Sequence, residues 1–147
     1  MKRSSSLVCS LVAATIMGSC VGSAATMADD GLAIDYRQQV MKTKQAQTAA
    51  IGQILTQTVP EENIISHFEI LLLATRQSKA AFAKKVLGGN SQPIIWERWD
   101  DFSARLARVE ADLVVAIDTL RTQGVTNAGE LAVTVTGCKD CHDIYKK

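Results

Sequence analysis

Cys138, Cys141 and His142 stand within five residues of one another, in the sequence Cys-Lys-Asp-Cys-His near the end of the chain. On a helix, thiols at positions i and i+3 face the same side, and the imidazole that follows projects beside them. This spacing is typical of c-type haem attachment, in which both thiols bond to vinyl groups on one porphyrin edge. The motif therefore predicts one haem c, covalent through Cys138 and Cys141, with His142 as an axial ligand of the iron.

Three other uses of a Cys-x-x-Cys pair remain as alternatives. A dithiol oxidoreductase carries such a pair at a helix N-terminus in a βαβ unit, whereas we expect this pair near a helix C-terminus. A structural zinc site needs four ligands, and only His67 could complete the set, with the adjacent Cys141 and His142 binding one ion. A disulfide between Cys138 and Cys141 would close a very short loop and stabilise the fold little.

The first residues of the chain indicate export. A positively charged start is followed by an apolar run that has the length of a signal-peptide core and is too short to span a bilayer. Small residues then lead to Ala28, so we predict a signal peptide over residues 1–28 and a mature domain over 29–147. An uncleaved N-terminal anchor is the alternative. Export predicts a periplasmic location.

Charge and cysteine content narrow the classes of partner. The chain has 16 basic and 15 acidic side chains, and the predicted signal peptide removes two basic ones, which leaves a formal charge of −1. This balance gives no electrostatic support for nucleic acid or an anionic membrane as a partner. The signal peptide also holds two of the four cysteines. The two that remain are those of the motif, and haem attachment would consume both.

The sequence pattern of the mature chain predicts four helices. Proline and glycine breaks separate segments in which apolar residues recur with the helical period. The predicted helices cover residues 30–57, 60–87, 93–120 and 127–147. Four such helices joined by short loops predict an all-α fold, an antiparallel four-helix bundle around a covalently bound haem. A strand at 133–136, where β-branched residues cluster, is the alternative within the last segment.

Three stretches give the mature chain a resemblance to the class II cytochromes c, the family of cytochrome c′ and its low-spin relatives. These stretches are YRQQVM at 36–41, PIIW at 93–96 and CKDCHDIYK at 138–146. In the more familiar cytochromes c the haem motif lies near the mature N-terminus, whereas here it ends a four-helix chain. The resemblance implies a periplasmic haem protein, often a homodimer packed through its first two helices.

The resemblance also gives roles to residues outside the motif. Met41 falls where the family places the side chain that faces the open side of the iron. Arg37, one turn earlier, falls where a basic residue approaches a haem propionate, and Lys146 falls beside the proximal face. The second helix departs from cytochrome c′, because AAFAKK at 80–85 stands near the place of a tryptophan-bearing segment. That difference leaves the contacts along the haem edge and the gas-binding subtype open.

Two functional hypotheses differ in what Met41 does. If its sulfur ligates the iron opposite His142, the haem is six-coordinate and low-spin, and the protein is an electron carrier for periplasmic or membrane redox partners. If Met41 only packs over the iron, the haem is five-coordinate and high-spin, and it binds nitric oxide or carbon monoxide. The sequence does not decide, and we take electron transfer as the main prediction.

Other chemistry-bearing residues fit structural roles better. His67 lies off the apolar stripe of its helix, so a hydrogen-bonded or solvated histidine is expected rather than a sixth iron ligand. The charged residues between 97 and 101 are predicted to form a solvated face. No nucleophile–base set, glycine-rich phosphate loop or pair of carboxylates stands at a catalytic spacing, so we predict no enzyme activity.

Overall fold

A computed structural model describes residues 22–126 and 138–147. The all-α prediction is confirmed, since these residues form helices and no strand beyond one isolated bridge between Ser91 and Lys146. The helices are α1 (Gly22–Leu55), α2 (Ile64–Ala83), α3 (Ile94–Glu97), α4 (Trp99–Gln123) and α6 (Lys139–Tyr145). No helix among the described residues is long and apolar enough to cross a membrane.

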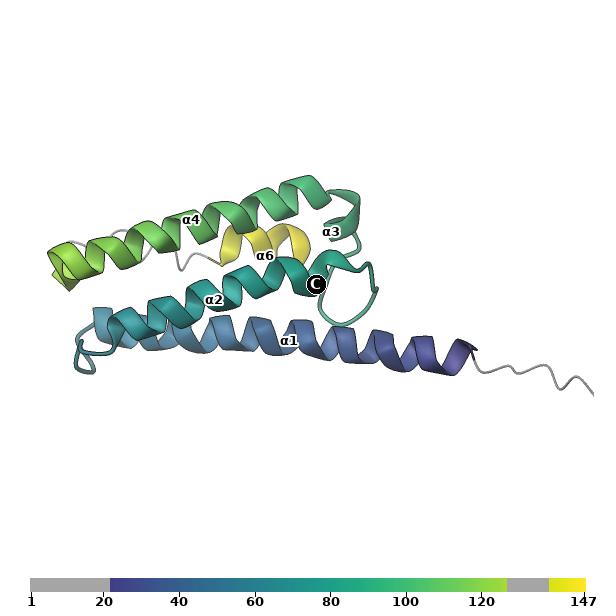
Figure 1. The fold of residues 1–147 in the computed structure, drawn as a ribbon, viewed down its shortest axis with the longest axis horizontal. Coiled ribbons are helices and arrows are strands. Elements are labelled where there is room, and N and C mark those ends of the chain that lie inside the picture. The colour runs from purple at the N-terminus through teal and green to yellow at the C-terminus, as the bar shows by residue number, and fades with distance from the viewer. Residues whose placement is uncertain (1–21, 127–137) are drawn as a thin grey trace, which may run out of the picture.

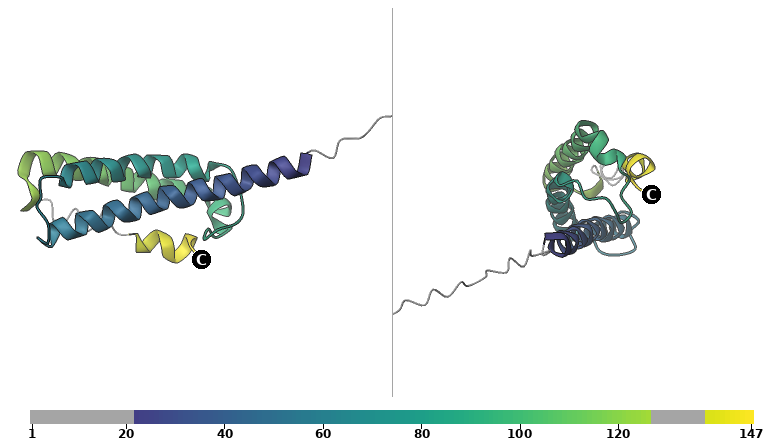
Figure 2. Two further views of the ribbon diagram at one scale, coloured as in Figure 1. Left: turned by 90° about the horizontal axis from the view of Figure 1, so that it is seen from below. Right: turned by 90° about the vertical axis from the view of Figure 1, so that its right-hand side faces the viewer.

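Three long helices form the body of the bundle. Figure 1 shows α1, α2 and α4 side by side, with successive helices running in opposite directions and α2 between the other two. The short α6 completes the four-helix arrangement. In the end-on view of Figure 2, α6 stands on the side away from α2, so that α1, α2, α4 and α6 surround the interior of the bundle.

One apolar cluster closes the end of the bundle where α1 meets α2. Ile51 of α1, Phe68 of α2 and Leu113 of α4 are all completely buried within it. Burial of large apolar side chains is the main stabilising contribution to such a core, and removing one leucine side chain costs about 2–5 kcal/mol. This end of the molecule therefore supplies stability.

A second apolar cluster sets the position of α6. It joins Phe82 of α2, Ile95 of α3, Phe102 and Leu106 of α4, and Tyr145 of α6. The Phe102 ring centroid lies 5.3 Å from that of Phe82 and 5.1 Å from that of Tyr145, and the latter pair is edge-to-face. Because these rings come from three helices, their packing fixes α6 against α2 and α4.

The prediction of one continuous third helix is wrong. In the structure this segment breaks at Arg98 into α3 and α4. Arg98 leaves the helical region, with φ −120° and ψ 44°. The break lets the Trp96 indole nitrogen donate to the Phe82 carbonyl oxygen at 2.9 Å, where α2 is ending. A carbonyl in the last turn of a helix lacks an intrahelical partner, so this contact across the fold favours the break.

Other predicted boundaries differ by up to about eight residues (30 against 22) or fall outside the described part. α2 begins at Ile64 rather than near residue 60, and α1 begins at Gly22 rather than near residue 30. Residues 1–21, most of the predicted signal peptide, lie outside the described residues. So do residues 127–137, with the first part of the predicted fourth helix and the alternative strand.

Candidate haem site

A cavity of about 660 Å³ lies among α1, α2, α4 and α6. The residues along its walls include the five predicted haem-binding residues: Arg37, Met41, Cys138, Cys141 and His142. Its volume lies within the range of roughly 300–1,000 Å³ that small-molecule and cofactor sites occupy. Residues about a hundred positions apart in the chain thus meet in one cavity.

The motif sits on the first turn of α6. Cys138 caps the N-terminus of this helix with helical dihedrals, φ −81° and ψ −16°, and its carbonyl oxygen accepts from the His142 backbone N–H at 3.1 Å. We expected the pair near the C-terminus of a longer helix, and the described helix instead begins right after Cys138. The i, i+3 relation of the thiols holds because Cys138 already has helical geometry.

The segment before α3 holds the end of α6 in place. The Gln92 N–H donates to the Tyr145 carbonyl oxygen at 2.9 Å, and the Lys147 N–H donates to the Asn90 carbonyl oxygen at 2.8 Å. These bonds form the isolated bridge region beside Ser91. The short terminal helix is therefore tied down by backbone hydrogen bonds as well as by ring packing.

Tyr145 also joins α6 to α4 through its hydroxyl group. The Tyr145 hydroxyl donates to the Asp101 carboxylate, which in turn accepts from Arg105 Nε at 2.9 Å. The charges around residue 101 are predicted to form a solvated face, and the Asp101 side chain is 37% exposed while it also forms this bond to α6. No local pattern marks the bond, since its partners are 44 residues apart.

The charge state of the motif favours metal ligation by histidine. Burial lowers the pKa of His142, and the nearby charges of Lys146 and Lys44 lower it further. The imidazole is therefore neutral at neutral pH, the form that binds metals. Burial raises the pKa of the Cys141 thiol, against the opposing effect of Arg105 and Lys44.

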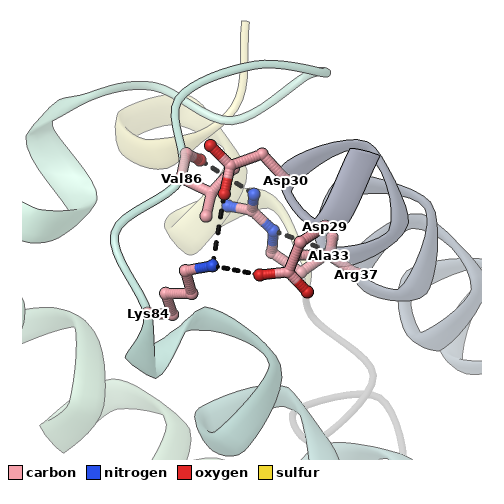
Figure 3. A network of polar contacts seen from close by, with 6 residues as sticks. All are labelled: Asp29, Asp30, Ala33, Arg37, Lys84 and Val86. Carbon is pink, nitrogen blue, oxygen red and sulfur yellow. Dashed lines mark hydrogen bonds and ion pairs between the residues drawn. The ribbon is translucent and has the colours of Figure 1, made fainter. Parts of the chain in front are cut away.

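Arg37 is an almost fully buried cation on α1, with only 3% of its surface exposed. Its Nη2 donates to the Val86 carbonyl oxygen at 2.8 Å, and its Nε donates to the Ala33 carbonyl oxygen at 3.2 Å (Figure 3). The guanidinium carbon also lies 5.3 Å from the ring centroids of both Phe82 and Trp96. These contacts hold the group rigidly at the cavity wall.

One nitrogen of Arg37 has no partner among the described residues. Its Nη1 is buried and makes no hydrogen bond. An unsatisfied buried donor costs about 1–3 kcal/mol, and more for a charged group. Arg37 is also one of the residues that line the cavity, so a carboxylate bound there is a candidate acceptor for this nitrogen. A haem propionate has the required chemistry.

Two carboxylates and a lysine surround the outer side of Arg37. Lys84 Nζ lies 2.6 Å from Asp29 Oδ2 and 3.2 Å from Asp30 Oδ1 (Figure 3). These ion pairs join the segment after α2 to α1, about two turns before Arg37. The sequence analysis did not predict these ion pairs, because none of the three residues belongs to a motif.

Met41 and His67 occupy different environments. Met41 is half-buried on α1, lines the cavity and packs against the cluster that contains Phe82 and Phe102. His67 does not line the cavity, and its Nδ1 lies 2.7 Å from Gln47 Oε1 in a hydrogen bond. The hydrogen-bonded position of His67 agrees with the structural role expected for it.

The family model described as Cytochrome C′ matches residues 32–146. This chain belongs to the cytochrome c′ family. The resemblance noted in the sequence is therefore confirmed. No curated protein matches the sequence.

Solved structures agree with this assignment at the level of the fold. A cytochrome c′ is 24% identical, with a TM-score of 0.72, over 80% of this chain and 97% of that chain. Cytochrome c prime from Shewanella frigidimarina is 21% identical, with a TM-score of 0.71, over 80% and 96%. A ferrous variant of cytochrome c prime from Alcaligenes xylosoxidans with bound NO is 24% identical, with a TM-score of 0.72, over 80% and 95%.

The cofactor of the family fits the residues of this site. The prosthetic group is haem c, bound covalently through the cysteines, and Cys138 and Cys141 are the pair in the C-terminal region. The cavity offers the two thiols, a neutral imidazole and an unpartnered guanidinium nitrogen. Among the residues that the structure describes, no group of three or more His, Cys, Asp or Glu side chains forms a separate metal site.

Proposed function

We propose that the protein binds nitric oxide or carbon monoxide at a haem iron whose strong protein ligand is His142. The observation that carries this proposal is the packing of Met41 against the apolar cluster of Phe82 and Phe102, which engages the side chain in the bundle core. A structure of a family relative with bound NO supports the same reading. When bound, the haem supplies an iron site that accepts a diatomic ligand.

The residues of this chain bind and orient the cofactor. We assign Cys138 and Cys141 to the two thioether links and the neutral imidazole of His142 to the iron. We assign Arg37 Nη1 as the donor that would pair with a haem propionate. Tyr145, through its bond to Asp101, keeps α6 and therefore the imidazole in a fixed orientation.

Optical titration of the purified haem-loaded protein tests this function. We expect a high-spin ferric spectrum and, after reduction, a shift of the Soret band that saturates with added carbon monoxide. Met41→Leu keeps the apolar volume but removes the sulfur, so it should leave the spin state and the carbon monoxide affinity close to those of the wild type. A ferrous protein that is low-spin and does not bind carbon monoxide would refute the proposal.

Electron transfer remains the second candidate, and one observation favours it. Met41 lines the same cavity as His142, so its thioether sulfur is a candidate second iron ligand. The same variant separates the two functions, because Met41→Leu would then convert a low-spin spectrum into a high-spin one. Loss of the sulfur ligand would also lower the reduction potential.

Export and self-association complete the proposed function. We infer a periplasmic location from the predicted signal peptide over residues 1–28. Sequencing the N-terminus of protein recovered from a periplasmic extract tests this, and a start at residue 29 is expected. Intact residues 1–28 on the recovered protein would overturn it.

The outer face of α1 and α2 is the surface proposed for a homodimer. Leu32 is 69% exposed and Leu73 is 58% exposed, and Tyr36 and Ile70 are also exposed. The Tyr36 hydroxyl donates to Gln77 Oε1 at 3.3 Å, so side chains from both helices meet on this face. Sedimentation should give a dimer that Leu73→Lys converts to a monomer without loss of helicity. A wild-type monomer at high concentration would contradict it.

A further inference from the structure

A groove lies between α2 and α4 on the outside of the bundle. Its volume is about 250 Å³, and it shares no residue with the haem cavity. The residues that line it are Glu69, Leu72, Val114, Ile117, Asp118 and Arg121. In the end-on view of Figure 2, no other helix of the described part covers this side of α2 and α4. The groove is therefore a surface that the haem site does not use.

Apolar side chains occupy the middle of this groove. Val114 on α4 is 46% exposed, and Leu72 on α2 is half-buried. Leu73, which belongs to the surface proposed for the homodimer, follows Leu72 directly, so the two apolar surfaces adjoin. Contiguous exposed apolar surface often marks a site of protein association. Its removal from water would provide the attraction for a partner.

An ion pair joins α2 to α4 at each end of the groove. Glu69 Oε1 lies 2.5 Å from Arg121 Nη2, and Glu110 Oε1 lies 2.8 Å from Arg76 Nε. Glu69 and Arg76 are seven residues apart on α2, which is about 10 Å along a helix. The signs alternate, because α2 carries the acid at one end and the base at the other, and α4 carries the reverse.

These four charges, one at each corner of the groove, form a pattern that is complementary to itself. A second copy can be turned by 180° about an axis in the plane of this face, either along the helices or across them. In both cases each acidic corner meets a basic corner of the other copy. A partner with charges of a single sign would meet two repulsive corners for two attractive ones. The pattern therefore favours a second copy of this chain.

We propose that the groove face, meaning the surface of α2 and α4 around Val114, binds the groove face of a second copy of this protein. Leu72 and Val114 supply the apolar contact. The charged corners set the orientation rather than the strength, because exposed ion pairs contribute little free energy. Small interfaces of this kind are typical of weak complexes, so the association depends on concentration.

The groove face acts in addition to the homodimer surface of α1 and α2. Use of both surfaces would join dimers into tetramers at concentrations above those at which the dimer forms. The inference does not depend on which ligand the haem iron binds.

Sedimentation of the haem-loaded protein over a rising concentration series tests this proposal. The wild type should reach one doubling of mass more than Val114→Glu. This substitution should weaken that step at least about tenfold, because it buries an unpaired carboxylate between the two copies. Circular dichroism checks that each variant is folded.

Val115→Glu is the matched control for Val114→Glu. Val115 is 55% exposed on the same helix but does not line the groove. It lies about 100° around the helix from Val114. Its substitution should change the association by less than about twofold, as expected for a surface position away from the contact.

Charge variants test the alternating pattern itself. Glu69→Lys with Glu110→Lys makes all four corners positive, and Arg76→Glu with Arg121→Glu makes all four negative. Neither variant should associate through the groove face, because like charges then meet in either orientation. An equimolar mixture of the two should associate again. The measurements are made at physiological ionic strength, where distant exposed charges are screened.

Four results would overturn the proposal. They are a wild type that shows no further doubling of mass, a Val114→Glu variant that associates as strongly as the wild type, an equal loss in Val115→Glu, and a mixture of the charge variants that does not associate. Failure of the α1–α2 homodimer would instead lower the starting mass and leave the doubling that depends on Val114 in place. The two surfaces are therefore tested separately.

Discussion

Arg37 Nη2 donates to the Val86 carbonyl oxygen at 2.8 Å, which joins the middle of α1 to the segment just after α2. The same guanidinium keeps Nη1 buried and unpartnered at the cavity wall. Two of its donors are thus used to hold the group and another remains for a ligand. Arg37 is at once a structural link and the cation best placed to receive a carboxylate.

Substitution of Arg37 tests this double role. Arg37→Met keeps much of the side-chain volume but removes the charge and the donors, so we expect the reduction potential of the haem to fall. The protein should also lose about 1–3 kcal/mol of stability, because the Val86 carbonyl oxygen loses its partner. Potentiometry and urea unfolding of the haem-loaded protein measure both effects.

Arg76→Met is the matched control for Arg37. Arg76 forms an ion pair with Glu110 at 2.8 Å on the exposed surface of α2 and α4. Exposed pairs of this kind contribute about 0–1 kcal/mol. A fall in potential as large in Arg76→Met as in Arg37→Met would show that the effect comes from net charge alone.

Lys84 should influence the haem potential without greatly changing stability. Its pairs with Asp29 and Asp30 are solvent-exposed, so Lys84→Gln should leave the melting temperature nearly unchanged. The substitution leaves two uncompensated carboxylates beside Arg37, which offsets the positive charge of the guanidinium and should lower the potential. Lys85→Gln, an exposed neighbour, is the control, and equal shifts in the two variants would contradict the prediction.

The sequence predicted the features that depend on local spacing. The two thiols and the imidazole are adjacent in the chain, and the stripe of Phe102 and Leu106 has the helical period, so the motif and the helix that supports it could be found directly. Contacts between distant residues left no such pattern. The bond from Trp96 to the Phe82 carbonyl, which accompanies the break at Arg98, is of this kind.

The acid stability of the protein should depend on the bond between Tyr145 and Asp101. The hydrogen bond from Tyr145, followed by that from Arg105, lowers the pKa of Asp101 below its ordinary value of 3.8. A carboxyl group with a lowered folded-state pKa stabilises the fold above its unfolded pKa, and this stabilisation is lost as the pH falls through the folded value. The loss is therefore expected below about pH 3.8.

Tyr145→Phe should weaken that acid dependence. It removes the largest cause of the lowered Asp101 pKa but keeps the ring that packs on Phe102, so the cost at neutral pH should be about 1 kcal/mol. Unfolding free energies measured between pH 2 and pH 7 compare the variant with the wild type. A pH profile parallel to that of the wild type would show that Tyr145 does not set the Asp101 pKa.

Extending the same unfolding measurements above pH 10 gives an internal check. Burial, followed by the hydrogen bond to Asp101, raises the pKa of Tyr145 above its ordinary value of 10.0. A group with a raised folded-state pKa contributes its stabilisation below the unfolded value and loses it as the pH rises through the folded value. Stability should therefore fall above about pH 10 in the wild type, and this contribution should be absent in Tyr145→Phe.

Substitution by alanine should have opposite effects on stability at Gly88 and Gly52. Gly88 lines the cavity with a φ of +138°, and an added Cβ would lie 2.6 Å from Ile34 Cδ1. Gly88→Ala therefore combines strain of about 1–3 kcal/mol with displacement of a side chain at the cavity wall. Gly52 lies on α1 with nothing within 4 Å of an added Cβ.

Gly52→Ala should stabilise the protein by about 0.5–1 kcal/mol, because alanine loses less backbone entropy than glycine in a helix. Thermal unfolding of both variants measures the contrast, and carbon monoxide binding should change only in Gly88→Ala, because Gly88 lines the cavity. If Gly88→Ala is as stable as the wild type and binds carbon monoxide equally well, the segment after α2 does not constrain the cavity.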